Sequence, residues 1–109
     1  MTTVQVPQRM NFSTVSPKVF KAVLALDAAA REGLDPVLLE LVQIRASQIN
    51  HCAYRIDYHT SDARGAGESE ERIYQLSAWE ESTSLFTAKE RSALALTEAV
   101  TLLPQGVPE

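Results

Sequence analysis

The sequence predicts an all-α fold of about five helices, and three of its features indicate this class. Residues that cap helix N-termini precede stretches in which apolar residues recur every three or four positions. Glycines follow the first and the third of these stretches, as is typical after a helix C-terminus. No stretch alternates apolar and polar residues like a half-buried strand, and no hairpin turn signal is present.

One domain and an arm account for the chain. Residues 1–15 have mixed polar composition without a period, so we expect them to form an arm. Residues 16–109 are predicted to form one helical domain, because 109 residues suffice for one domain and not for two. The segment Pro104–Glu109 has the composition of a linker, from which we expect that further helices once followed it.

The first two helices have the same start signal. Ser16-Pro17 and Asp35-Pro36 each place a capping residue before a proline at the first helical position. The first helix is predicted to reach about Arg31, before Gly33, and the second to reach about Gln48. The apolar stripe of the first helix consists of Val19, Phe20, Val23, Leu24 and Leu26.

Three more helices are predicted in the second half of the chain. Asn50 is expected to cap a helix over residues 51–63, and Ser69 to cap one that ends near Ser82. The last helix follows a capping box, Thr87 with Glu90, and is predicted to reach about Leu103.

Charge and hydropathy exclude two classes of partner. The net charge is −4, and the basic residues are scattered, which argues against nucleic acid as the main partner. No apolar run approaches the roughly 18–20 residues of a membrane helix, so no membrane association is expected. Residues 1–10 have no apolar signal-peptide core, so a cytoplasmic location is predicted.

Cys52 and His59 are candidates for chemistry on the predicted third helix. They are seven residues apart and therefore share one helix face, with Arg55 between them. Cys52 would lie in the first turn, where free backbone N–H groups and the helix dipole favour a thiolate. The alternative is structural: a small buried cysteine, and a histidine that fills a niche in the core.

Glu40 is the third candidate, because apolar residues surround it on nearly every side of its helix. A carboxylate placed there must find a partner or take up a proton. An ordinary ion pair at the rim of the core is the alternative. His51 and Tyr54, which flank Cys52, are added as neighbouring candidates. Two histidines and one cysteine make a poor zinc set, so no metal site and no cofactor are expected.

The stretch from Glu40 to His59 resembles the core of the alkylhydroperoxidase D and carboxymuconolactone decarboxylase family. In this family a Glu is followed after twelve residues by the first Cys of a C-x-x-C motif, and a His lies four residues after the second Cys. Glu40, Cys52 and His59 hold the matching positions. The resemblance covers roughly residues 17–103. It implies a compact helical domain that forms trimers or hexamers and reduces peroxides through its cysteine pair.

The chain departs from the family pattern at two positions. Arg55 stands where the family has its second cysteine, which is the one that meets peroxide, and His51 stands where glycine is common. Cys52 matches the resolving cysteine, and the chain has no other, so no disulfide can close within it. The resemblance therefore implies thiol-dependent peroxide reduction that is impaired and needs an external thiol.

Two other functions remain open at this point. The first is a carboxymuconolactone decarboxylase-like enzyme, in which His59 and Glu40 exchange protons and Arg55 holds the carboxylate of a small substrate. The second is a non-catalytic oligomeric helical module. The sequence names no substrate and no electron donor.

Overall fold

The computed structural model describes residues 9–103, and in them it is all-helical. It contains six α-helices and one 3₁₀ turn, so the predicted fold class is confirmed. The chain divides into two compact units, one up to Gly33 and one from Leu34. The linker predicted at residues 104–109 lies outside the described residues, as do residues 1–8 of the predicted arm.

The first unit holds a single-turn helix, α1 (Phe12–Val15), and a longer helix, α2 (Pro17–Arg31). Asn11 caps α1 by accepting a hydrogen bond from Ser13 N at 3.2 Å. This turn lies within the segment for which an arm without periodicity was expected. The rings of Phe12 and Phe20 join the two helices edge to face, with centroids 6.1 Å apart.

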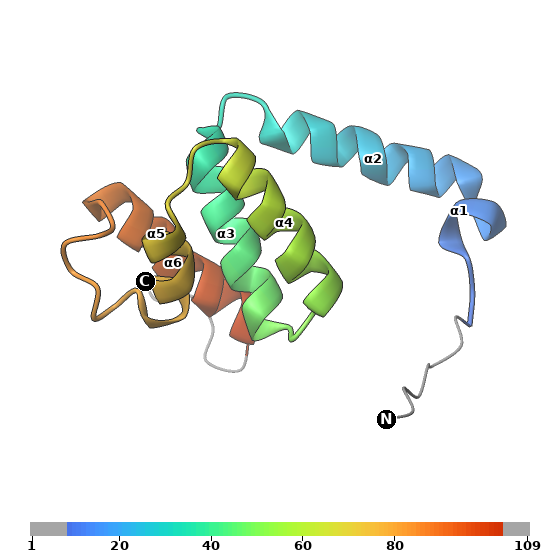
Figure 1. Cartoon of the computed structure of the whole chain (residues 1–109). Coiled ribbons are helices and arrows are strands. Elements are labelled where there is room, and N and C mark those ends of the chain that lie inside the picture. Colours follow the sequence, from blue (N-terminus) through green and yellow to red (C-terminus); the bar gives the residue numbers. More distant parts are fainter. Residues whose placement is uncertain (1–8, 104–109) are drawn as a thin grey trace. The chain divides into compact units, whose positions relative to one another are not determined.

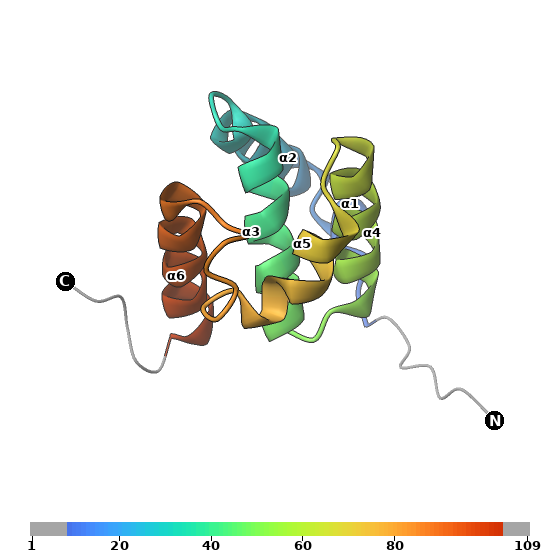
Figure 2. The same cartoon turned by 60° about the vertical axis from the view of Figure 1, so that its left-hand side comes forward.

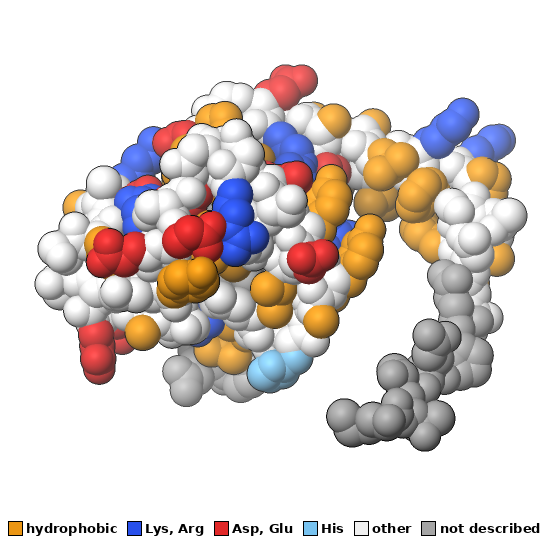
Figure 3. All heavy atoms as spheres, in the orientation of Figure 1, with side chains coloured by type: hydrophobic (Ala, Val, Ile, Leu, Met, Phe, Trp, Pro, Cys, Tyr) orange, Lys and Arg blue, Asp and Glu red, His pale blue; other side chains and the backbone are white. Residues whose placement is uncertain are grey.

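Helix α2 has the predicted bounds and begins with Pro17 in its first turn, although the Ser16 side chain makes no capping hydrogen bond. None of its residues is buried. Its predicted apolar stripe is therefore largely exposed, including Val23 at 48% and Leu24 at 53%. Apolar side chains gather along this helix in Figure 3.

The second unit is built around α3 (Pro36–Ile49), which Asp35 caps as predicted by accepting from Val37 N at 3.0 Å. Helices α4 (Ala53–Gly65) and α6 (Ala88–Leu102) flank α3 on either side (Figure 2). Helix α4 runs antiparallel to α3 (Figure 1). The core of this unit consists of Leu41, Ile44, Ala63, Leu76, Trp79, Phe86 and Leu94.

Two short elements connect α4 to α6. Helix α5 (Glu70–Gln75) begins at Ser69, whose side chain accepts from Arg72 N as the cap prediction required. The helix ends at Gln75, and the 3₁₀ turn η1 (Leu76–Ala78) follows, so the predicted end near Ser82 is too late. The capping box at the start of α6 is confirmed, because Thr87 and Glu90 each accept from the other's backbone N–H.

The described surface carries charges of both signs. Acidic and basic side chains are interspersed on the face of the second unit seen in Figure 3, without a basic patch. Among residues 9–103, no helix combines the length and the apolar character needed to cross a membrane. The cytoplasmic location stays a prediction.

Candidate functional site

The junction between α3 and α4 determines where the cysteine lies. His51 N donates to Gln48 O at 3.1 Å, and Cys52 N donates to Ser47 O at 3.0 Å. This pair of bonds is the Schellman pattern that closes a helix C-terminus, with His51 in the left-handed region at φ 54°. Asn50 therefore ends α3 and does not begin α4, which corrects the predicted N-cap.

Cys52 is itself the N-cap residue of α4. It is partly buried, and its sulfur is not part of a disulfide. Its side chain makes no capping hydrogen bond, while its carbonyl accepts from Ile56 N at 3.0 Å. Cys52 thus lies at the N-terminal end of α4, beside backbone N–H groups that have no partner within the helix.

The structure brings Glu40 and His59 together across the α3–α4 contact. The Nδ1 atom of His59 lies 3.1 Å from the Oε2 atom of Glu40. Their side chains are 4% and 13% exposed respectively, so most of this contact is shielded from water. The ring of Tyr58 meets the His59 ring edge to face at 5.1 Å. A shielded imidazole–carboxylate pair can hold a proton and pass it to a third group.

The remaining candidates lie at the surface. His51, Tyr54 and Arg55 are all exposed, Tyr54 at 75%. The Tyr54 ring stacks on Tyr58, one turn further along α4, with centroids 6.3 Å apart. These exposed side chains contrast with the Glu40–His59 pair, which is largely shielded from water.

Asp62 is a neighbour that the sequence analysis missed. One oxygen of Asp62, one oxygen of Glu40 and one ring nitrogen of His59 all lie within 4.8 Å of one another. These three side chains are thus the group in this region that could hold a metal ion. The His-x-x-Asp spacing on one helix was the available signal, but the contribution of Glu40 requires the α3–α4 pairing.

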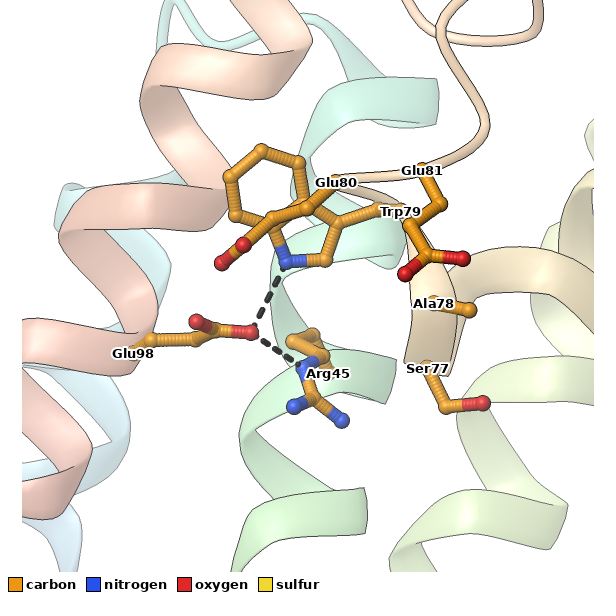
Figure 4. Close-up of a pocket in the computed structure, with 7 residues that line it drawn as sticks. All are labelled: Arg45, Ser77, Ala78, Trp79, Glu80, Glu81 and Glu98. Carbon is orange, nitrogen blue, oxygen red and sulfur yellow. Dashed lines mark hydrogen bonds and ion pairs between the residues drawn. The ribbon is translucent and has the colours of Figure 1, made fainter.

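A separate pocket of about 420 Å³ opens between α3, η1 and α6 (Figure 4). Glu98 lies at its inner wall and accepts from Arg45 Nε at 2.9 Å and from Trp79 Nε1 at 2.8 Å. A second pocket of about 220 Å³ has an apolar lining from α3 and α6. Neither lining includes Glu40, Cys52 or His59. These two pockets are therefore separate from the Glu40–His59 pair and from Cys52.

Comparison with known proteins shows the family of this chain. The family model of the carboxymuconolactone decarboxylase family matches residues 17–99, which spans α2 to α6 and includes all the candidate residues. The chain belongs to the carboxymuconolactone decarboxylase family. The resemblance found in the sequence is thereby confirmed.

Two known proteins are similar to this chain over most of its length. The uncharacterized protein YdfG of Bacillus subtilis (strain 168) is 40% identical over 104 residues, which cover 94% of this chain and 70% of YdfG. A crystal structure from Agrobacterium tumefaciens is similar with a TM-score of 0.82 and 38% identity, over 94% of this chain and 71% of that one. That protein is described as being of unknown function and as a candidate antioxidant defence protein AhpD.

Proposed function

We propose that this family member is a thiol-dependent peroxide-reducing protein of the alkylhydroperoxidase D type, which works with one cysteine and is slowed by Arg55. The observation that carries the proposal is the shielded Glu40–His59 pair on the helix hairpin that also holds Cys52. The likeness to a candidate antioxidant protein supports the same reaction class.

The reaction begins when the Cys52 thiolate attacks the terminal oxygen of a hydroperoxide. A sulfur–oxygen bond forms and the O–O bond breaks, so that sulfur is oxidised to a sulfenic acid and the peroxide is reduced to an alkoxide. The alkoxide takes a proton from the Glu40–His59 pair and leaves as an alcohol. One external thiol then displaces water from the sulfenic acid. A second external thiol reduces the mixed disulfide and releases Cys52.

The helix geometry explains why this reaction should be slow. Cys52 and His59 are separated by about 10 Å along the axis of α4, at about 1.5 Å per residue, whereas position 55 is only about 6 Å from His59. The side chain of His59 leans toward the helix N-terminus, which shortens its distance to Cys52 but does not bring the two groups into contact. The proton donor is therefore placed better for a sulfur at position 55 than for Cys52.

Arg55 determines how the cycle ends. It stands three positions after Cys52, about one turn further along α4, where a second cysteine would lie. It forms no covalent bond to sulfur, so it cannot capture the sulfenic acid as a second cysteine would. Capture then depends on collision with an external thiol, which lacks the advantage of a partner held in place.

The test is peroxide consumption with a dithiol donor such as dithiothreitol. Arg55→Cys should raise the rate about tenfold or more over wild type, because it restores an internal sulfur next to His59. Arg55→Ser is the matched control, since it also removes the guanidinium but adds no sulfur, and it should not exceed wild type. Equal rates for wild type and Arg55→Cys would show that the missing cysteine does not limit this protein. Peroxide reduction that survives in Cys52→Ser would refute the thiol mechanism altogether.

A further inference from the structure

We propose that Glu40, His59 and Asp62 form a binding site for a divalent transition-metal ion such as Zn²⁺. The site lies on the inner face of the α3–α4 hairpin, and Cys52 takes no part in it. This proposal goes beyond peroxide reduction and does not depend on it.

The distances within the cluster suit one shared ion. Two zinc–ligand bonds of about 2.1 Å at the tetrahedral angle place their ligand atoms about 3.4 Å apart. The Glu40 oxygen and the His59 nitrogen are already separated by 3.1 Å. The three candidate ligand atoms all lie within 4.8 Å of one another, so the longest of their separations must shorten by at most about 1.4 Å to reach this spacing. Rotation of the exposed Asp62 side chain would complete the set.

The three proposed ligands are distributed over two neighbouring helices, as ligands are in known metal sites of helical proteins. His59 and Asp62 are three residues apart on α4 and therefore on one face, while Glu40 projects from the neighbouring helix α3. Helical bundles build carboxylate-rich metal sites from an i, i+3 pair of an acid and a histidine, together with a glutamate from a facing helix. The three ligands leave coordination positions for water or a small substrate.

The local charge also favours a cation. Two carboxylates converge on one imidazole. Of the two basic residues of α4, Arg55 is exposed, and Arg64, two positions after Asp62, is engaged elsewhere. Its Nη2 atom donates to Glu70 Oε2 at 3.2 Å, and its Nε atom donates to the other oxygen of Glu70. An imidazole among carboxylates selects Zn²⁺, Fe²⁺ or Mn²⁺ over Mg²⁺ and Ca²⁺, which prefer oxygen ligands alone.

The expectation of no metal site rested on the two histidines and the one cysteine of the chain. In the proposed site, two of the three ligands are carboxylates from different helices.

The proposal is tested by titrating untagged, metal-free protein with ZnCl₂ in a calorimeter. We expect saturable binding of one ion per chain, weakened about tenfold or more in Asp62→Asn. Asp57→Asn is the matched control, because it removes another exposed acid of α4 that lies outside the cluster, and it should bind like wild type. Cys52→Ser should also bind like wild type, and MgCl₂ should give no comparable binding. Circular dichroism of each variant checks that the helices are intact.

Three results would overturn the site. They are the absence of saturable Zn²⁺ binding by wild type, full binding by Asp62→Asn, and loss of binding in Cys52→Ser, which would place the ion on the thiol. CoCl₂ gives an independent readout, since an absorption band from sulfur-to-cobalt charge transfer would also assign the ion to Cys52. None of these measurements involves peroxide, so the site and the proposed reaction can fail separately.

Discussion

At His51 the backbone adopts a conformation that favours glycine. Its φ of 54° lies in the left-handed region, which costs a residue with a Cβ about 1–2 kcal/mol. Glycine avoids this strain but loses more freedom on folding, up to about 1 kcal/mol. We therefore predict that His51→Gly raises the free energy of unfolding by about 0.5–1 kcal/mol, measured by urea denaturation. His51→Ala keeps the Cβ and should show no such gain. An equal gain in both variants would attribute the effect to the imidazole and not to the backbone.

Single positions differ in how far the sequence alone could explain them. The spacing of Glu40 and His59 matched the family pattern, and the structure brings the two side chains within 3.1 Å. The substitution at His51 was also visible, but its physical meaning required the backbone angle. Asp62 was missed although His59 lies one turn before it on the same helix. Its other neighbour, Glu40, belongs to α3, and only the tertiary structure brings it to Asp62.

An ion-pair network on Arg72 links α5 to α6. Arg72 Nε donates to Glu68 at 2.7 Å, and its Nη1 atom donates to Glu90 at 3.1 Å and to the carbonyl of Leu85 at 2.7 Å. Burial tends to raise the pKa of Glu90. The hydrogen bonds from Arg72 and from the backbone of Thr87 outweigh it and hold this pKa below its ordinary value of 4.5. The carboxylate form of Glu90 therefore stabilises the folded state.

The sign of this shift determines a pH dependence. The pKa of Glu90 is lower in the folded state than in the unfolded state. Its contribution to the free energy of unfolding is therefore present above about pH 4.5 and is lost as the pH falls through the pKa of the folded state. Glu90→Gln should lower the free energy of unfolding at about pH 7 by about 1–3 kcal/mol, and the loss should shrink at acid pH. Urea denaturation at about pH 7 and at acid pH measures the loss of stability under each condition. Glu71→Gln, at an exposed acid of α5, is the control and should change stability little. A loss of equal size at both pH values would contradict the ionic origin.

Whole helices were predicted more reliably than their junctions. The caps at Asp35, Ser69 and Thr87 each make the predicted side-chain hydrogen bond. Asn50 was assigned to the wrong helix end, because asparagine suits an N-cap and a C-terminal position alike, and the sequence gives no backbone angle. Helix α5 ends early because its last turn tightens into η1, which places Leu76 and Trp79 in the core. The end of α5 is therefore determined by the packing of these two side chains and not by the helix propensity of the segment.

For the molecule as a whole, the described surface exposes more large apolar side chains than an isolated domain of this size needs. They include Val19, Val23, Leu24 and Leu26 of α2, Tyr54 and Tyr58 of α4, and Leu96, Val100 and Leu102 of α6. Scattered exposed apolar residues are ordinary, but contiguous ones mark contact surfaces. The stripe on α2 is contiguous, since its members recur at helical spacing. We propose that the chain assembles into a homo-oligomer, as the family resemblance also implies.

The apolar stripe of α2 offers a direct test of assembly. Multi-angle light scattering at micromolar concentration should give a multiple of the 12.0 kDa chain mass for wild type. Val23→Glu places a charge in the stripe and should shift the protein toward the monomer, because a carboxylate buried in an apolar contact without a partner is strongly unfavourable. Ala25→Glu adds the same charge two residues further along, on nearly the opposite side of α2, and should leave the mass unchanged. A monomeric wild type would refute the assembly, and an oligomer that withstands Val23→Glu would exclude this stripe from the contact.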